Sequence, residues 1–192
     1  MNLWTRFSRN LDIGGRKPLL VRRERVAGLG AGRRLLFASD LHLRCGGPQR
    51  VVDEFLEIVR NERPDMVLLD MWARIASIPD SVYYDITWTG HTVDPVPAEF
   101  ARVFEVVTGA RDRAIERVQR AIASGETIAG YHVDDAARAH IAEAGFGDAF
   151  VHRTGHSIGR DVHGTGANMD NLETHDERRI IPRTCFSIEP GI

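Results

Sequence analysis

The sequence has few of the residues that several classes of protein require. Only 2 of its 192 residues are cysteine, and Lys17 is its single lysine. Cys45 and Cys185 lie far apart and match no paired metal-binding spacing, so we expect reduced thiols rather than a disulfide framework. With one lysine, Schiff-base chemistry and a phosphate-binding lysine loop have almost no residue to use.

Long apolar runs and a dominant charge are also missing. No apolar stretch reaches the roughly 18 residues that suggest a membrane span, and residues 1–17 lack the continuous apolar core of a signal peptide. The net charge is −2, without the concentrated basic face of nucleic-acid-binding proteins. The sequence therefore predicts a cytoplasmic globular protein with neither a membrane nor a nucleic acid as partner.

Hydrophobic patterning divides the chain into three segments. Residues 1–32 contain scattered arginines and a Gly-rich patch, which predicts a poorly ordered lead-in. Residues 33–69 predict a strand at 35–38, a helix at 49–62 and a strand at 66–69. This order is the strand–helix–strand unit that begins a parallel α/β sheet.

Residues 70–192 form the third segment, in which helices and strands are mixed. The elements expected there are a strand at 81–88, a helix at 97–125, a helix capped by Asp134 that ends at Gly145, and a strand at 184–188. The fold class expected from these elements is α+β.

Acidic residues and histidines of the third segment stand next to its predicted strands. They are Asp70, Asp85, His156 and Glu189, with His152 and His163 nearby. Carboxylates with one imidazole suit divalent metals such as Mn²⁺, Co²⁺ or Zn²⁺. Carboxylates can also bridge two ions about 3.5–4 Å apart, which generate hydroxide from water at neutral pH. Spacing alone leaves a more ordinary role open for each aspartate, as a helix cap or a solvated surface group.

Several stretches of the third segment resemble the metallopeptidase family of Xaa-Pro aminopeptidases, prolidase and methionine aminopeptidase. They are His152-Arg153-Thr154-Gly155-His156-Ser157-Ile158-Gly159, Val162-His163-Gly164, Phe186-Ser187-Ile188-Glu189-Pro190-Gly191 and Tyr84-Asp85-Ile86-Thr87-Trp88. The last resembles the family's strand that bears its second metal-binding aspartate. The resemblance covers about residues 70–192. It implies a pita-bread α+β fold and two-metal hydrolysis of an N-terminal peptide bond.

The resemblance implies a role for each matching residue. The metal ligands it implies, for two divalent ions (Mn²⁺, Co²⁺ or Zn²⁺), are Asp70, Asp85, His156 and Glu189. The separation of 15 residues between Asp70 and Asp85 is wider than the common family pattern. His152 and His163 resemble the histidines that contact substrate, since an imidazole can donate to a developing oxyanion. The substrate implied is a peptide with proline at the second position, and a homodimer is left open.

The resemblance implies one further metal ligand, at a position beyond Ile192. The family's bridging glutamate follows the Glu-Pro-Gly motif on a later strand, whereas this sequence ends at Ile192. From the sequence alone we therefore expect a metallopeptidase site that is one carboxylate short, with activity impaired by truncation, or a non-catalytic fusion fragment.

Residues 33–69 resemble a second family. Leu36-Phe37-Ala38-Ser39-Asp40-Leu41-His42-Leu43 and Arg63-Pro64-Asp65-Met66-Val67-Leu68-Leu69 resemble the opening of calcineurin-like metallophosphoesterases. That resemblance implies that Asp40 and His42 bind one metal of a dinuclear site. The family's later glycine, asparagine and histidine motifs are missing. The chain thus resembles a splice of two metallohydrolases near residues 66–70, and a phosphoesterase fragment using Asp40 and His42 is the alternative function.

Overall fold

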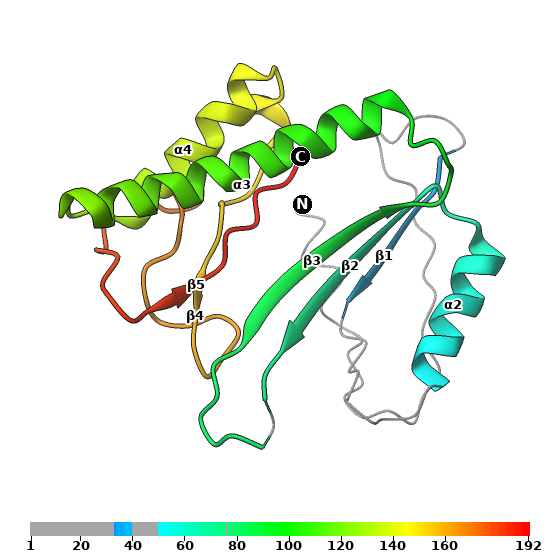
Figure 1. The fold of residues 1–192 in the computed structure, drawn as a ribbon, viewed down its shortest axis with the longest axis horizontal. Helices are drawn as coiled ribbons and strands as arrows, with labels where there is room; N and C mark the ends of the chain where they lie inside the picture. The colour runs from blue at the N-terminus through cyan, green and yellow to red at the C-terminus, as the bar shows by residue number, and fades with distance from the viewer. Residues whose placement is uncertain (1–32, 40–49, 76) are drawn as a thin grey trace. The chain divides into compact units, whose positions relative to one another are not determined.

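The computed structural model describes residues 33–39, 50–75 and 77–192 (Figure 1). These residues form two compact units. One contains the described residues before Asp70 together with Thr89–Thr92, and the other contains Asp70–Trp88 and Val93–Ile192. The predicted lead-in at 1–32 lies outside the described residues. So do Asp40 and His42, the two metal ligands predicted for the phosphoesterase fragment.

The first unit contains the predicted strand–helix–strand sequence. Its elements are β1 (Leu35–Ser39), α2 (Arg50–Glu62), the start of β2 (Met66–Ala73) and the end of β3 (Tyr84–His91). The strands lie in the order β1-β2-β3, and in Figure 1 β1 and β2 run the same way while β3 runs the opposite way. Asp65 connects the strand ends, because its amide donates to the Arg34 carbonyl (2.8 Å) and its own carbonyl accepts from the Thr92 amide (3.0 Å).

The amphipathic pattern of α2 agrees with its burial. Val51, Val52, Phe55, Ile58 and Val59 are half-buried, whereas the residues between them include exposed side chains. The helix ends before Pro64, which is buried and precedes β2. The helix predicted from apolar spacing is therefore confirmed, while β2 continues four residues beyond the predicted 66–69 into the second unit.

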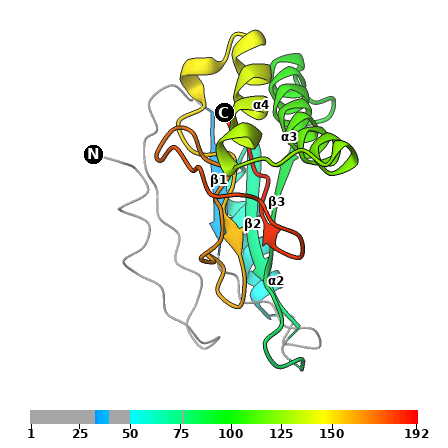
Figure 2. The same cartoon turned by 90° about the vertical axis from the view of Figure 1, so that its left-hand side faces the viewer.

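Two packed helices provide the core of the second unit. They are α3 (Ala98–Ser124) and α4 (Gly130–Glu143), which lie side by side in Figures 1 and 2. Alanines of both helices and two branched residues of α4 are fully or almost fully buried in one cluster: Ala110, Ala114, Ala121, Val133, Ala137 and Ile141. The chain leaves α3 at Gly125, whose left-handed backbone (φ 71°) suits glycine as a helix C-cap. No helix in the described part is long and apolar enough to cross a membrane.

Short elements complete the second unit. A 3₁₀ turn, η1 (Gly147–Ala149), is followed by β4 (Ser157–Ile158), which pairs antiparallel with β5 (Cys185–Phe186). The strand predicted at 184–188 is thus only two residues long. The reason lies at His156, whose amide donates to the side-chain hydroxyl of Ser187 (3.0 Å) rather than to a backbone carbonyl.

The prediction that Asp134 caps a helix is wrong. The helix begins at Gly130, four residues earlier, and the ring of His132 accepts the amide of Ala129 there (Nδ1, 3.1 Å). Asp134 lies inside α4 and is fully buried. Its carboxylate accepts from Arg138 Nε (2.9 Å) and from both the amide and the hydroxyl of Thr154 (2.8 and 2.6 Å). It therefore anchors the loop that leads to His156.

Replacing Asp134 by alanine should unfold the chain more easily. The change removes the carboxylate that pairs with the Arg138 guanidinium and accepts from the buried Thr154 hydroxyl, so we expect a loss of about 3–5 kcal/mol in the free energy of unfolding. Urea unfolding followed by circular dichroism measures it. Asp135→Ala is the matched control, since Asp135 is exposed and accepts one hydrogen bond, from Asn171. Equal losses in the two variants would contradict the anchoring role.

Asp176 anchors a second loop of the same unit. It is buried, and its carboxylate accepts from the amides of Asn168 (2.8 Å) and Arg178 (3.0 Å) and from the Arg178 guanidinium. Burial alone raises the pKa of Asp176, but these hydrogen bonds and the Arg178 charge outweigh it, so the pKa lies below its usual range.

The stabilisation from Asp176 should depend on pH. Because the pKa is lower in the folded chain, the contribution is complete above the unfolded pKa of about 3.9 and is lost as the pH falls through the folded pKa. We expect the difference in unfolding free energy between the parent and Asp176→Asn to be constant near pH 6 and to shrink below about pH 4. Urea unfolding across this range measures it. A difference that does not change with pH would refute the assignment.

Candidate metal centre

Asp85 reaches the interior from β3. Along this strand Tyr84, Ile86 and Trp88 are exposed, whereas the Asp85 side chain is only 3% exposed, as expected where alternate residues face opposite sides. The amide of Tyr83 donates to the Gly159 carbonyl (3.0 Å), which holds the start of β3 beside the end of β4. This contact brings Asp85 to His156.

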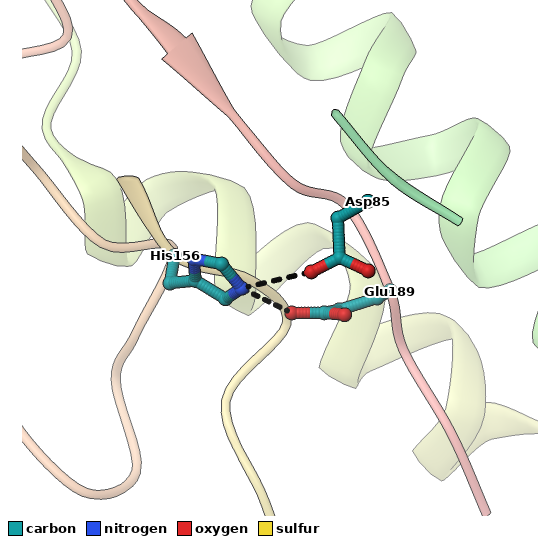
Figure 3. Close-up of side chains that lie close together, drawn as sticks. All are labelled: Asp85, His156 and Glu189. Atoms are coloured by element: carbon teal, nitrogen blue, oxygen red, sulfur yellow. Dashed lines mark ion pairs between the residues drawn. The ribbon is translucent and has the colours of Figure 1, made fainter. Parts of the chain in front are cut away.

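His156 is a buried histidine with a defined orientation. Its Nδ1 lies 3.0 Å from the carbonyl oxygen of Ser157, an acceptor only, so Nδ1 donates. A neutral ring with its hydrogen on Nδ1 carries the lone pair on Nε2. Nε2 lies 3.3 Å from Asp85 Oδ2 and 3.3 Å from Glu189 Oε1 (Figure 3). The ring therefore presents its metal-binding nitrogen to both carboxylates.

Ser187 connects His156 to Glu189. Its hydroxyl accepts from the His156 amide and donates to Glu189 Oε1 at 2.9 Å. The sequence reasoning missed this residue. A signal was available, because Ser187 lies two residues before Glu189 in an extended segment, and such residues project to the same side.

Asp85, His156 and Glu189 form a cluster suited to a cation. One possible ligand atom from each lies within 4.8 Å of the others. Asp85 Oδ1 is buried and has no hydrogen-bond partner among the described residues, and buried polar atoms are normally paired. Two carboxylates and one imidazole are ligands that Mn²⁺, Co²⁺ and Zn²⁺ accept. The cluster therefore fits a divalent metal.

The pKa directions describe the same crowding of negative charge. Burial raises the pKa of Glu189, and the nearby Asp85 raises it further, against a lowering effect of the Ser187 hydroxyl. Burial lowers the pKa of His156, but a protonated ring would also donate from Nε2 to Asp85 and would lie beside two carboxylates, and these effects raise the pKa above its usual value. Both directions reflect a site in which one more positive charge is favourable.

Asp70 lies in the same region but outside this cluster of three. It stands on β2, and its Oδ1 accepts from the Thr87 hydroxyl on β3 (3.1 Å). Its charge contributes to the raised pKa of Glu189. The structure thus brings three of the four predicted metal ligands together and places the fourth on the adjacent strand.

The two other predicted histidines have different surroundings. The exposed His163 packs its ring 4.4 Å from that of His156, and desolvation together with His156 lowers its pKa. His152 packs edge-on against Phe150 (5.1 Å), with Nδ1 2.7 Å from the Arg153 carbonyl. The ring of His152 also lies close to Gly191, since a Cβ atom added to Gly191 would lie 3.0 Å from His152 Nε2. His163 therefore borders the cluster, and His152 lies beside the segment that follows Glu189.

The sequence matches metallopeptidase family M24 over residues 47–192. The chain belongs to this family. The match begins before Asp70 and includes α2, so it extends into the segment that resembles a phosphoesterase. That second resemblance stays a prediction.

Individual members of the family agree with this assignment. The Xaa-Pro dipeptidase of Pyrococcus furiosus is 32% identical over 134 residues, which cover 69% of this chain and 34% of that protein. The Xaa-Pro dipeptidase of Lactobacillus helveticus is 36% identical over 90 residues, 47% of this chain and 22% of that protein. This chain thus spans about a third or less of the curated relatives' length.

A solved structure supports the predicted fold. The crystal structure of a dipeptidase from Pyrococcus horikoshii matches with a TM-score of 0.52 and 31% identity, covering 65% of this chain and 31% of that one. The prediction of a partial pita-bread α+β fold is confirmed for the part that is covered.

Removing the Ser187 hydroxyl should weaken metal binding. Outer groups that orient metal ligands typically contribute about 10–100-fold to metal affinity, and Ser187→Ala removes the one that holds Glu189 Oε1. Calorimetric titration with Mn²⁺ measures the affinity. Ser187→Thr keeps the hydroxyl and should stay close to the parent. Equal affinity in the alanine variant, with an unchanged melting temperature, would rule out the orienting role.

Proposed function

We propose that this M24 domain hydrolyses the N-terminal peptide bond of peptides with proline at the second position. The observation that carries the proposal is the buried cluster of Asp85, His156 and Glu189. It is supported by the dipeptidase names of the relatives and by the agreement of His156 and Glu189 with the family's motifs. The peptide substrate, the hydrolytic activity and a homodimeric assembly are all part of this proposal. A cytoplasmic location remains a prediction from the sequence.

The cluster residues have separate tasks in this proposal. Asp85, His156 and Glu189 would hold a divalent ion, Mn²⁺, Co²⁺ or Zn²⁺. Asp70 would serve a second ion of the same kind. When bound, such ions lower the pKa of a water and polarise a carbonyl. Ser157 and Ser187 orient the imidazole and the carboxylate, so that the donor atoms are in place before a metal arrives.

The histidines at the edge of the cluster would act on the substrate. His163 lies beside His156 and is exposed, so a ring N–H is able to donate to the oxygen of the scissile carbonyl. Such a donor stabilises the negative charge that develops on that oxygen. His152 is proposed for the same task with weaker support, because its described ring contacts are with Phe150, Arg153 and Gly191 and not with the cluster residues.

A substrate assay with two histidine variants tests the proposal. We expect the Mn²⁺-loaded chain to cleave Leu-Pro, and His156→Ala to lose both this activity and calorimetric Mn²⁺ binding. His42→Ala should keep both. An aryl phosphodiester is assayed in parallel, because the Asp40 and His42 reading predicts phosphoesterase activity instead.

Three outcomes of this assay would contradict the peptidase proposal. They are Leu-Pro cleavage that persists in His156→Ala, phosphodiester turnover that disappears in His42→Ala, and a parent chain that neither binds Mn²⁺ nor cleaves Leu-Pro. His175→Ala controls for nonspecific effects of losing a histidine, since His175 is exposed and pairs with Asn171 and Glu177.

A further inference from the structure

A tryptophan stands beside the metal cluster with much of its surface exposed. Trp72 follows Asp70 by two residues on β2, so the two side chains project to the same side of the strand. The residue is 43% exposed. It contacts the ring of His163 edge-on, with the ring centroids 6.2 Å apart and the planes at 74°.

The ring contacts lead from Trp72 to the metal cluster. The His163 ring that touches the indole also lies 4.4 Å from the ring of His156. A group that lies against the exposed indole is therefore two ring contacts away from a proposed metal ligand. An aromatic surface of this kind next to a few polar groups is typical of small-molecule sites.

Resting on the proposed function, we propose that Trp72 determines the preference for proline by contacting the pyrrolidine ring of the substrate. In an Xaa-Pro bond the proline nitrogen is the scissile nitrogen, so the ring lies directly beside the bond that is hydrolysed. With His163 donating to the scissile carbonyl oxygen, the pyrrolidine ring lies near the side chain that contacts His163, which is Trp72.

The chemistry of the two rings is complementary. The pyrrolidine ring is compact and apolar, and its C–H groups beside the amide nitrogen carry a partial positive charge. The indole presents a broad apolar surface with a negative π face. An alanine in place of proline offers neither the ring nor its contact area, so Trp72 discriminates between the two residues.

Kinetics of tryptophan variants test this assignment. Trp72→Ala should raise KM for Leu-Pro about tenfold with kcat changed little, because it removes binding contact rather than a reacting group. The ratio of kcat/KM for Leu-Pro to that for Leu-Ala should fall by a similar factor. Trp72→Phe should recover most of the loss. Trp88→Ala is the matched control. Trp88 is also exposed, and on β3 it projects to the face opposite that of Asp85 and Thr87.

Fluorescence provides a readout that does not depend on turnover. In a background of Trp4→Phe and Trp88→Phe, Trp72 is the sole emitting tryptophan. Titration of the Mn²⁺-loaded protein with L-proline should shift its emission to shorter wavelength, and L-alanine should not.

The outcomes separate the inference from the proposed function. An active parent in which Trp72→Ala changes neither KM nor the proline-to-alanine ratio overturns the role of Trp72 and leaves the peptidase function standing. An effect that follows the first residue, Leu-Pro against Gly-Pro, but not the second also overturns it, because the indole then contacts the other side chain. A parent that binds Mn²⁺ but cleaves neither dipeptide overturns both.

Discussion

The metal cluster depends on the close approach of two short segments around Gly155 and Ser187. A Cβ atom added to Gly155 would lie 2.0 Å from the Ser187 carbonyl oxygen, so no other residue fits there without displacing the chain. This proximity permits the Ser187 amide to donate to the His156 carbonyl (2.8 Å) and the Glu189 amide to donate to the Thr154 carbonyl (2.7 Å). His156 and Glu189 are 33 positions apart in sequence, and these contacts place His156 Nε2 3.3 Å from Glu189 Oε1.

The rest of the second unit supports this junction. Asp134 and Arg138 hold the loop before it: the carboxylate binds Thr154 and the guanidinium donates to the Phe150 and His152 carbonyls (3.0 Å each). Asn168 supports it from the other side, since its side chain accepts the Ser157 amide (3.0 Å). The donor atoms are therefore held by backbone and buried polar contacts, which is the preorganisation that a metal site requires.

Local patterns in the sequence predicted the long elements well and the short ones poorly. Apolar spacing was sufficient for α2 and α3, because the apolar residues of α2 are half-buried on one face and α3 buries Ala110, Ala114 and Ala121 on one face. The helix cap was misassigned, because an aspartate near a helix start has the same local appearance whether it caps the helix or, like Asp134, binds a loop 20 residues away. The two-residue strands β4 and β5 depend on contacts that no local window contains.

The site itself was predicted mainly through motifs. Asp85, His156 and Glu189 were nominated from the family resemblance, and the structure brings them together. Ser187 and Trp72 were overlooked, because a serine hydroxyl or an indole acquires its role only from what lies opposite it in space. Asp40 and His42 lie outside the described residues, so the hypothesis that the chain joins parts of two metallohydrolases remains a prediction from the sequence.

The central claim is that His156 binds a metal through Nε2 while Nδ1–H is held by the Ser157 carbonyl. Proton NMR of the Co²⁺-loaded protein tests it directly, because the paramagnetic ion shifts the N–H resonance of a bound histidine far from the others. We predict one shifted resonance that disappears in D₂O and is missing in His156→Ala. No such resonance in the loaded parent, or one that persists in His156→Ala, would contradict the account.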